Sequence, residues 1–98
     1  MKIIKDNQGV IVFKGNLVVS TIDAAHSQME KLLDEMSPDV VIDLSDVDDI
    51  DLAGLQFLTS LKKTFENDSS LHIRAVNASV MERIVLSGFN LTLREALS

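Results

Sequence analysis

The chain lacks residues that several kinds of functional site depend on. It has no cysteine, which excludes a disulfide framework, a thiolate nucleophile and a cysteine-ligated metal site. It has no tryptophan or tyrosine and only four phenylalanines, so no aromatic platform for stacking nucleic-acid bases is expected. No apolar run approaches the roughly 18 residues of a membrane span, and the first residues lack the apolar core of a signal peptide. We therefore expect a cytoplasmic protein without direct membrane insertion.

Positive charge is also scarce. The 98 residues include nine Lys and Arg against fifteen Asp and Glu, which gives a net charge of −6. Nucleic acids and anionic membranes are bound mainly by basic side chains, so neither is expected as a partner. A chain of this length, 46% apolar, is predicted to form one domain over residues 1–98.

The sequence contains none of the common motifs for nucleotide binding or nucleophilic catalysis. Gly-x-Gly-x-x-Gly, the phosphate-binding loop and Gly-x-Ser-x-Gly are absent, and no Ser/His/Asp set can be brought together from the pattern. His26 and His72 belong to different predicted elements and are interpreted as surface histidines. The chain is therefore predicted not to be an enzyme and to carry no cofactor.

One stretch is strongly acidic and raises the question of a metal site. Its carboxylates are Asp43, Asp46, Asp48, Asp49 and Asp51. A calcium-binding loop that starts at Asp46 would need an oxygen ligand where Ile50 stands and glycine where Asp51 stands. We therefore interpret these acids as a solvated loop and predict no metal. A second hypothesis, in which Asp51 accepts a phosphoryl group as in receiver domains, lacks the acid pair expected after the first strand.

The first half of the chain predicts a hairpin and a helix. Residues 3–5 and 10–13 are predicted to form two short strands separated by a polar turn, and Gly15 with Asn16 is predicted to end the second strand. Ser20 and Asp23 have capping-box spacing ahead of an amphipathic helix that Pro38 ends. The apolar side of that helix consists of Ile22, Ala25, Met29, Leu32, Leu33 and Met36.

The second half predicts two further strands and two further helices. Residues 40–44 form a β-branched run typical of a strand buried on both faces, and residues 45–51 are predicted to form a loop. A helix with Leu55, Leu58, Leu61 and Phe65 on its inner side follows. Leu71, Ile73 and Ala75 then alternate with exposed residues, as in a half-buried strand. Asn77 caps the next helix, Gly88 ends it, and Thr92 with Glu95 predicts a short terminal helix.

This order predicts an α/β fold, ββαβαβα, with helices packed on a mixed sheet of four to five strands. The predicted core includes Val10, Val12, Val41, Ile42, Leu44, Leu55, Leu58, Leu61, Ile73 and Ile84.

The chain resembles the STAS domain family, named for sulfate transporters and anti-sigma-factor antagonists. The resemblance covers the opening hairpin with its Gly15-Asn16-Leu17 turn, the strand at residues 40–44 and the segment that ends in Ser87-Gly88-Phe89. Its most specific part is the motif Asp51, Leu52, Ala53, Gly54 and Leu55 at the start of the second long helix. The family has Asp, then Ser or Thr, then a small residue and Gly-Leu at these positions.

The chain departs from the family at the residue that carries the regulatory phosphate. In the bacterial antagonists the residue after Asp is a Ser or Thr that a partner kinase phosphorylates, whereas here it is Leu52, which has no hydroxyl. The degenerate phosphosite predicts that the kinase switch is lost at this position. Ser45, Thr59 and Ser60 are the nearby hydroxyls to which it could have moved.

Structural roles for the same residues stay open at this point. Asp51 can cap the helix, with or without a binding role, and Leu52 is either a core residue or partly exposed at the contact surface. Gly54 is most simply explained by backbone clearance where the helix begins close to the sheet.

The resemblance implies a non-enzymatic protein-binding module of a bacterial regulatory system, such as an anti-sigma-factor antagonist or a chemotaxis- or two-component-associated protein. Its partner would be an anti-sigma-factor serine kinase, a phosphatase or a signalling complex, bound through the residues from Asp51 to Leu55. The alternative is a STAS subunit that docks on the ATPase of a lipid-transport complex. The protein itself is expected to be a monomer or weak dimer.

Overall fold

Four strands form one mixed sheet in the part of the chain that the computed structural model describes, which is residues 1–33, 39–64, 70–74 and 76–88. The elements follow the predicted order ββαβαβα: β1 (Lys2–Lys5), β2 (Ile11–Leu17), α1 (Ile22–Leu33), β3 (Asp39–Ile50), α2 (Leu52–Thr64), β4 (Ser70–Arg74) and α3 (Ala78–Leu86). The predicted α/β fold is confirmed.

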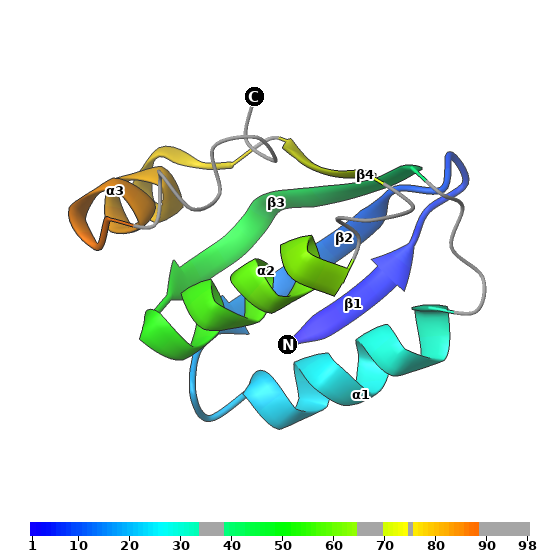
Figure 1. The fold of residues 1–98 in the computed structure, drawn as a ribbon, viewed down its shortest axis with the longest axis horizontal. Coiled ribbons are helices and arrows are strands. Elements are labelled where there is room, and N and C mark those ends of the chain that lie inside the picture. The colour runs from blue at the N-terminus through cyan, green and yellow to red at the C-terminus, as the bar shows by residue number, and fades with distance from the viewer. Residues whose placement is uncertain (34–38, 65–69, 75, 89–98) are drawn as a thin grey trace.

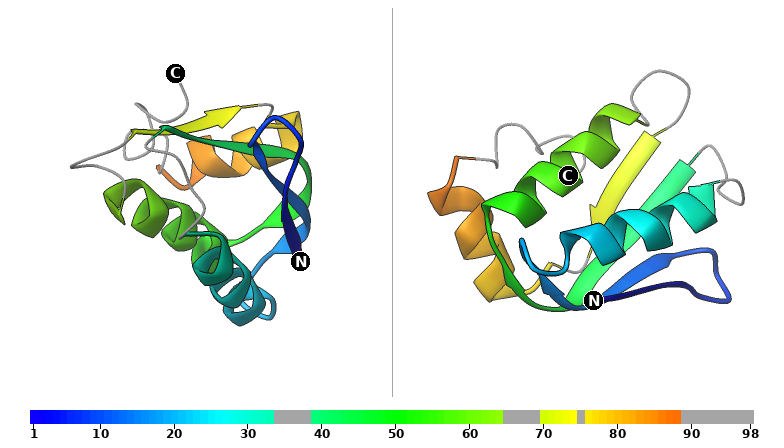
Figure 2. Two further views of the ribbon diagram at one scale, coloured as in Figure 1. Left: turned by 90° about the vertical axis from the view of Figure 1, so that its right-hand side faces the viewer. Right: turned by 90° about the horizontal axis from the view of Figure 1, so that it is seen from below.

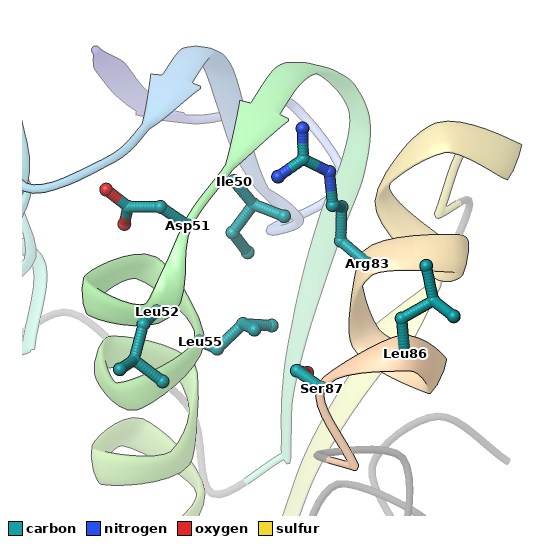
Figure 3. A pocket seen from close by; sticks show the side chains of 7 residues that line it. All are labelled: Ile50, Asp51, Leu52, Leu55, Arg83, Leu86 and Ser87. Carbon is teal, nitrogen blue, oxygen red and sulfur yellow. The ribbon is translucent and has the colours of Figure 1, made fainter.

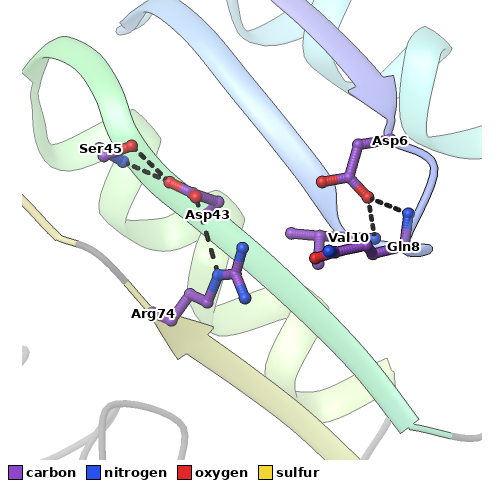
Figure 4. Close-up of polar contacts among 6 residues, drawn as sticks. All are labelled: Asp6, Gln8, Val10, Asp43, Ser45 and Arg74. Carbon is purple, nitrogen blue, oxygen red and sulfur yellow. Dashed lines mark hydrogen bonds and ion pairs between the residues drawn. The ribbon is translucent and has the colours of Figure 1, made fainter.

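The sheet begins with a hairpin and continues with parallel strands. β1 pairs antiparallel with β2, and β2–β3 and β3–β4 pair parallel, so the spatial order is β1-β2-β3-β4. The Asp6 carboxylate stabilises the hairpin turn by accepting hydrogen bonds from the backbone N–H groups of Gln8 and Val10 at 2.8 and 2.9 Å (Figure 4). The outer edge of β1 is held by Gln28 of α1, whose side chain accepts from Ile3 N–H at 2.7 Å and donates to the Met1 carbonyl at 3.0 Å.

The helices lie on one side of this sheet. α1 and α2 cover the same face, and α3 lies at the end of the sheet where β3 finishes (Figures 1 and 2). The core fills the space between them and is built from residues that are at most 8% exposed. It contains seven of the ten predicted core residues, namely Ile42, Leu44, Leu55, Leu58, Leu61, Ile73 and Ile84, and Val10 is also buried.

The predicted burial of both faces of the β3 run is wrong. Val40, Ile42 and Leu44 are buried against the helices, whereas Val41 and Asp43 on the other face are only half-buried. Val12 lies on the same outer face and is also half-buried, so Val12 and Val41 do not belong to the buried core. The pattern missed Phe13, which is fully buried, because a run of four apolar residues does not show which of its two faces the helices cover.

Two predicted strand ends are also wrong. β2 continues past Gly15 and Asn16 to Leu17, and β3 continues through the predicted acidic loop to Ile50. The two extensions pair with each other, with Leu17 opposite Ile50 and both residues buried. Gly15 has a φ of 105°, and the register shifts between it and Asn16, so the strand bends there without ending.

Helix ends agree with the sequence more closely. Asn77 caps α3 by accepting from Val80 N–H at 2.9 Å, and Gly88 follows the helix with a φ of 83°, as predicted. At α1 the carbonyl of Thr21 accepts the first helical hydrogen bond, from Ala25, so Thr21 and not Ser20 is the N-cap residue. The predictions for Met36, Pro38, Phe65, Ala75 and the terminal helix with Thr92 and Glu95 lie outside the described residues.

Two neighbouring residues of β3 provide a test of this one-sided burial. Ile42→Ala should lower the free energy of unfolding by about 2–5 kcal/mol, because it empties a fully buried site. Val41→Ala, on the half-buried face, should cost only about 1 kcal/mol. Urea denaturation of both variants measures the two losses of unfolding free energy. Equal losses would contradict the burial of only one face of β3.

Candidate functional site

The predicted site lies where β3 passes into α2. Asp51 is the one residue between the two elements, and Leu52 begins the helix. Of the five predicted residues, Leu52 is 57% exposed, Asp51 and Ala53 are half-buried, and Gly54 and Leu55 are buried. The core interpretation of Leu52 is therefore wrong. Leu52 is the member of the motif that offers most of its side chain to a partner, and Gly54 and Leu55 shape the surface from below.

The Asp51 carboxylate joins two segments of the chain at this point. Its Oδ1 accepts from the backbone N–H of Gly54 at 3.1 Å, which is the usual bond of a helix N-cap. Its Oδ2 accepts from Val19 N–H at 2.9 Å, in the turn that follows β2. In Figure 3 the side chain accordingly points away from α3. Asp51 caps the helix as predicted and also fixes the β2–α1 turn beside it.

The environment of Asp51 favours its charged form. Partial burial alone would raise the pKa of this carboxyl, but the N–H groups of Val19 and Gly54, with further backbone donors, hold the pKa below its ordinary value near 3.8. Asp51 is therefore a carboxylate at neutral pH, and its bonds to both segments are charge-assisted.

Gly54 is required by the close approach of α2 to the end of β2. A Cβ added at this position would overlap the carbonyl oxygen of Leu17 and lie 2.7 Å from Cγ1 of Ile50. The same Leu17 carbonyl accepts a hydrogen bond from Asp51 N–H at 3.3 Å. The clearance interpretation of Gly54 is confirmed, and the start of α2 is held against the sheet by backbone contacts.

α3 borders one side of a groove that the sequence analysis did not predict. The groove, of about 290 Å³, separates the start of α2 from the end of α3 (Figure 3). Leu55 points into it from α2, and Arg83 and Leu86 border it from α3. The sequence of α3 contains one indication of this surface. Val80 and Ile84 fill the inner side of the helix, so Val85 and Leu86 are apolar residues that remain outside the core.

Asn77 attaches α3 to the acidic end of β3. Its side-chain N–H donates to the Val47 carbonyl at 2.6 Å, while its oxygen caps the helix. Val47 is fully buried, but Asp46, Asp48 and Asp49 around it are exposed. The acids therefore lie on the outside of a strand and not in a loop. Within the described ranges, no group of three or more His, Cys, Asp or Glu is arranged to hold a metal ion.

The hydroxyls considered as displaced phosphosites are placed differently from Leu52. Ser45 donates to Asp43 at 2.6 Å on the outer face of the sheet, where Arg74 lies 3.7 Å from the same carboxylate (Figure 4). Partial burial would raise the pKa of Asp43, but Ser45 and Arg74 hold it below its ordinary value. Thr59 donates to the Leu55 carbonyl inside α2, and Ser60 is exposed farther along this helix. None of the three borders the groove between α2 and α3.

Fold and site together define a small α/β domain with a mixed sheet and an exposed, capped helix start at the end of its parallel strands. The family model described as "Mlab, STAS domain" matches residues 2–95, and the chain belongs to the STAS domain family. No curated protein matches the chain. STAS domains are in general non-catalytic modules that mediate protein–protein interactions, which supports the general prediction of a binding module. Among the described helices, none is long and apolar enough to span a membrane.

The Asp51 cap predicts a specific pH dependence. A carboxyl whose pKa is lowered by folding stabilises the protein above its unfolded pKa, and this stabilisation is lost as pH falls through the folded pKa. Asp51→Ala should therefore reduce the free energy of unfolding by about 0.5–2 kcal/mol at pH 7, with a smaller gap from the parent below about pH 4. Denaturation at several pH values measures the gap, with Asp51→Asn as the control that removes the charge and keeps one acceptor. A gap independent of pH would contradict the charge-assisted cap.

Gly54→Ala tests whether the close approach of α2 to β2 or helix propensity dominates at this position. The two effects change the free energy of unfolding in opposite directions. Propensity alone would make this change stabilising by up to about 1 kcal/mol. The overlap with the Leu17 carbonyl should instead destabilise the protein by about 1–3 kcal/mol. Thermal and urea unfolding both report the sign, and a stabilised variant would show that α2 can move away from β2 at little cost.

Proposed function

We propose that this STAS domain is a protein-binding regulatory module of a bacterial signalling system, cytoplasmic, and of the anti-sigma-factor-antagonist or chemotaxis-associated kind. Its partner is a serine-kinase anti-sigma factor, a phosphatase or another component of a signalling complex. It binds as one domain, monomeric or weakly dimeric, through the surface formed by Asp51, Leu52, Ala53, Gly54 and Leu55. The observation that carries this proposal is the exposure of Leu52 on a helix start that is fixed from below.

The rigidity of that helix start supports a docking role. The two oxygens of Asp51 are bonded to separate segments, and Gly54 lies directly against the β2 backbone. The backbone that carries the exposed leucine therefore loses little conformational freedom when a partner covers it, so more of the leucine's burial appears as affinity. Covering one leucine side chain contributes about 1.5–3 kcal/mol.

The same position argues against a phosphate switch in this protein. A phosphate at the first residue of α2 would add about −1.5 to −2 charges beside the Asp51 carboxylate. Leu52 has no hydroxyl that could be phosphorylated, so phosphorylation at this residue cannot regulate binding. A kinase partner would bind the domain without modifying position 52.

A second candidate function is a STAS subunit of a lipid-transport ATPase complex. The specific observation in its favour is again Leu52, because docking on an ATPase subunit requires a fixed apolar surface and no phosphate. The two functions differ in the protein that binds, so the partner recovered from the source organism discriminates them: a kinase or chemotaxis protein in one case and a nucleotide-binding transport subunit in the other.

Substitutions at Leu52 test the docking surface. A pull-down from the source organism, with Leu52→Asp as the paired control, identifies a partner whose affinity is then measured for the parent, Leu52→Ser and Leu52→Asp. We expect affinity to fall in that order, because Ser removes apolar contact and Asp adds a charge beside Asp51. Melting temperatures should stay close to that of the parent, since substitutions of exposed residues usually change stability by less than about 0.5 kcal/mol.

Lys63→Ser, at the other end of α2, is the matched control and should bind like the parent. Normal binding by Leu52→Asp would place the docking surface elsewhere. Intact-mass measurement of protein from the native host checks the absence of a phosphate switch, and high phosphate occupancy on Ser45, Thr59 or Ser60 would show that the switch has moved.

A further inference from the structure

The exposed large apolar residues of the described chain gather at one end of the molecule. Val19 lies in the turn after β2, Leu52 at the start of α2, and Val85 and Leu86 at the end of α3. These three segments lie together at the end of the sheet where β3 finishes (Figure 1). These four residues, which we call the end patch, are between 52% and 75% exposed, and two of them, Leu52 and Leu86, line the groove between α2 and α3. The end patch therefore extends well beyond the motif at the start of α2.

The surroundings of the end patch are acidic. Between Lys31 and Lys62 the sequence has no Lys or Arg but eight Asp and Glu. Three of these eight, Asp48, Asp49 and Asp51, stand at the end of β3 directly before Leu52, and the first two are exposed. Asp23 is also exposed in the first turn of α1, just after Val19. The apolar residues are thus bordered by carboxylates on two of their three segments.

One basic residue, Arg83, lines the groove beside the end patch, and its ion pair is weak. Arg83 is 3.6 Å from the Asp49 carboxylate, and both side chains are more than half exposed. An exposed pair at this distance contributes little and is screened by salt. A partner's Lys or Arg can take the place of Arg83 on Asp49 at small cost.

These charges disfavour a second copy of the chain as the occupant. A symmetric dimer through the end patch would bring two acidic borders together, from two chains that each have a net charge of −6. A basic partner would instead meet opposite charge around an apolar centre. Such an arrangement increases both association rate and selectivity.

We propose that the end patch and the adjoining groove bind a cationic amphipathic segment of the partner protein. Its apolar side chains cover Leu52 and Leu86, and its Lys or Arg side chains meet Asp48 and Asp49. This inference rests on the proposed function and adds to it the chemistry of the partner and the participation of α3. Leu86 is the deciding residue, because it is 75% exposed and lies outside the motif that suggested the site.

Three synthetic peptides of about 14 residues, long enough to form a helix on contact, test this chemistry. The first has leucines at helical spacing and lysines elsewhere, the second replaces lysine by glutamate, and the third replaces leucine by alanine. We expect the Leu/Lys peptide to shift the backbone amide NMR signals of Val19, Leu52 and Leu86. Leu86→Ser should weaken its binding about 10-fold, as should Leu52→Ser. Raising the salt concentration should weaken it further.

Several results would overturn the proposal. The Leu/Glu peptide binding as tightly would exclude charge selection, and the Ala/Lys peptide binding as tightly would exclude the apolar contact. Shifts confined to the outer sheet face around Val12 and Val41 would place the site elsewhere. Self-association of the protein that Leu86→Ser abolishes would make a second copy the occupant. A native partner that is sensitive to Leu52→Asp but indifferent to Leu86→Ser and to salt would overturn this inference while leaving the proposed function intact.

Discussion

The two-sided hydrogen bonding of the Asp51 carboxylate determines how the functional end of this domain is built. One oxygen accepts from Gly54 in the first turn of α2, and the other accepts from Val19, 32 positions before Asp51 in the turn after β2, so two separate segments share one anion. The Leu17 carbonyl, which accepts from Asp51 N–H and leaves no room for a Cβ at Gly54, holds α2 at a fixed distance from the sheet. The positions of Leu52 and Val19 are consequences of these contacts.

Within the candidate surface, this arrangement separates the residues that hold its shape from those that are most exposed. Asp51, Gly54 and Leu55 belong to the support, since their atoms are largely occupied by bonds or by core packing within the domain. Leu52, Leu86 and Val85 are free to be covered by a partner. If the proposed docking surface is correct, we expect a change in the support to alter stability first, and a change in the surface to alter binding and leave the fold intact.

Much of the fold could be predicted from the sequence, because the helices and turns are marked by local chemistry. Asn77, Gly88 and the hairpin turn at Asp6 have the structural roles that their residue types indicate. The extension of β3 to Ile50 could not be predicted in the same way, because acidic residues dominate its composition. The strand forms there because Val47 and Ile50 are buried and pair with the end of β2, which is a tertiary effect.

Less of the candidate site than of the fold could be predicted from the sequence. The motif pointed to Asp51 and Leu52. The sequence left Leu52 either in the core or partly exposed, and the structure shows it exposed. The contribution of α3 could not be predicted, because it depends on where Asn77 attaches the helix to the Val47 carbonyl. Likewise, the half-burial of Val41 and Val12 depends on which face the helices cover, and an apolar run does not contain that information.

The contact of Gln28 with β1 has a consequence for the behaviour of the sheet at its edge. Edge strands offer unpaired backbone groups to which another chain can add, and this is a common route to strand exchange and aggregation. The Gln28 amide occupies the outward N–H of Ile3 and the carbonyl of Met1 in the way that a neighbouring strand would. An incoming strand would have to displace this side chain from α1 before it could extend the sheet. A single glutamine thus protects the first strand of this acidic domain from the addition of another strand.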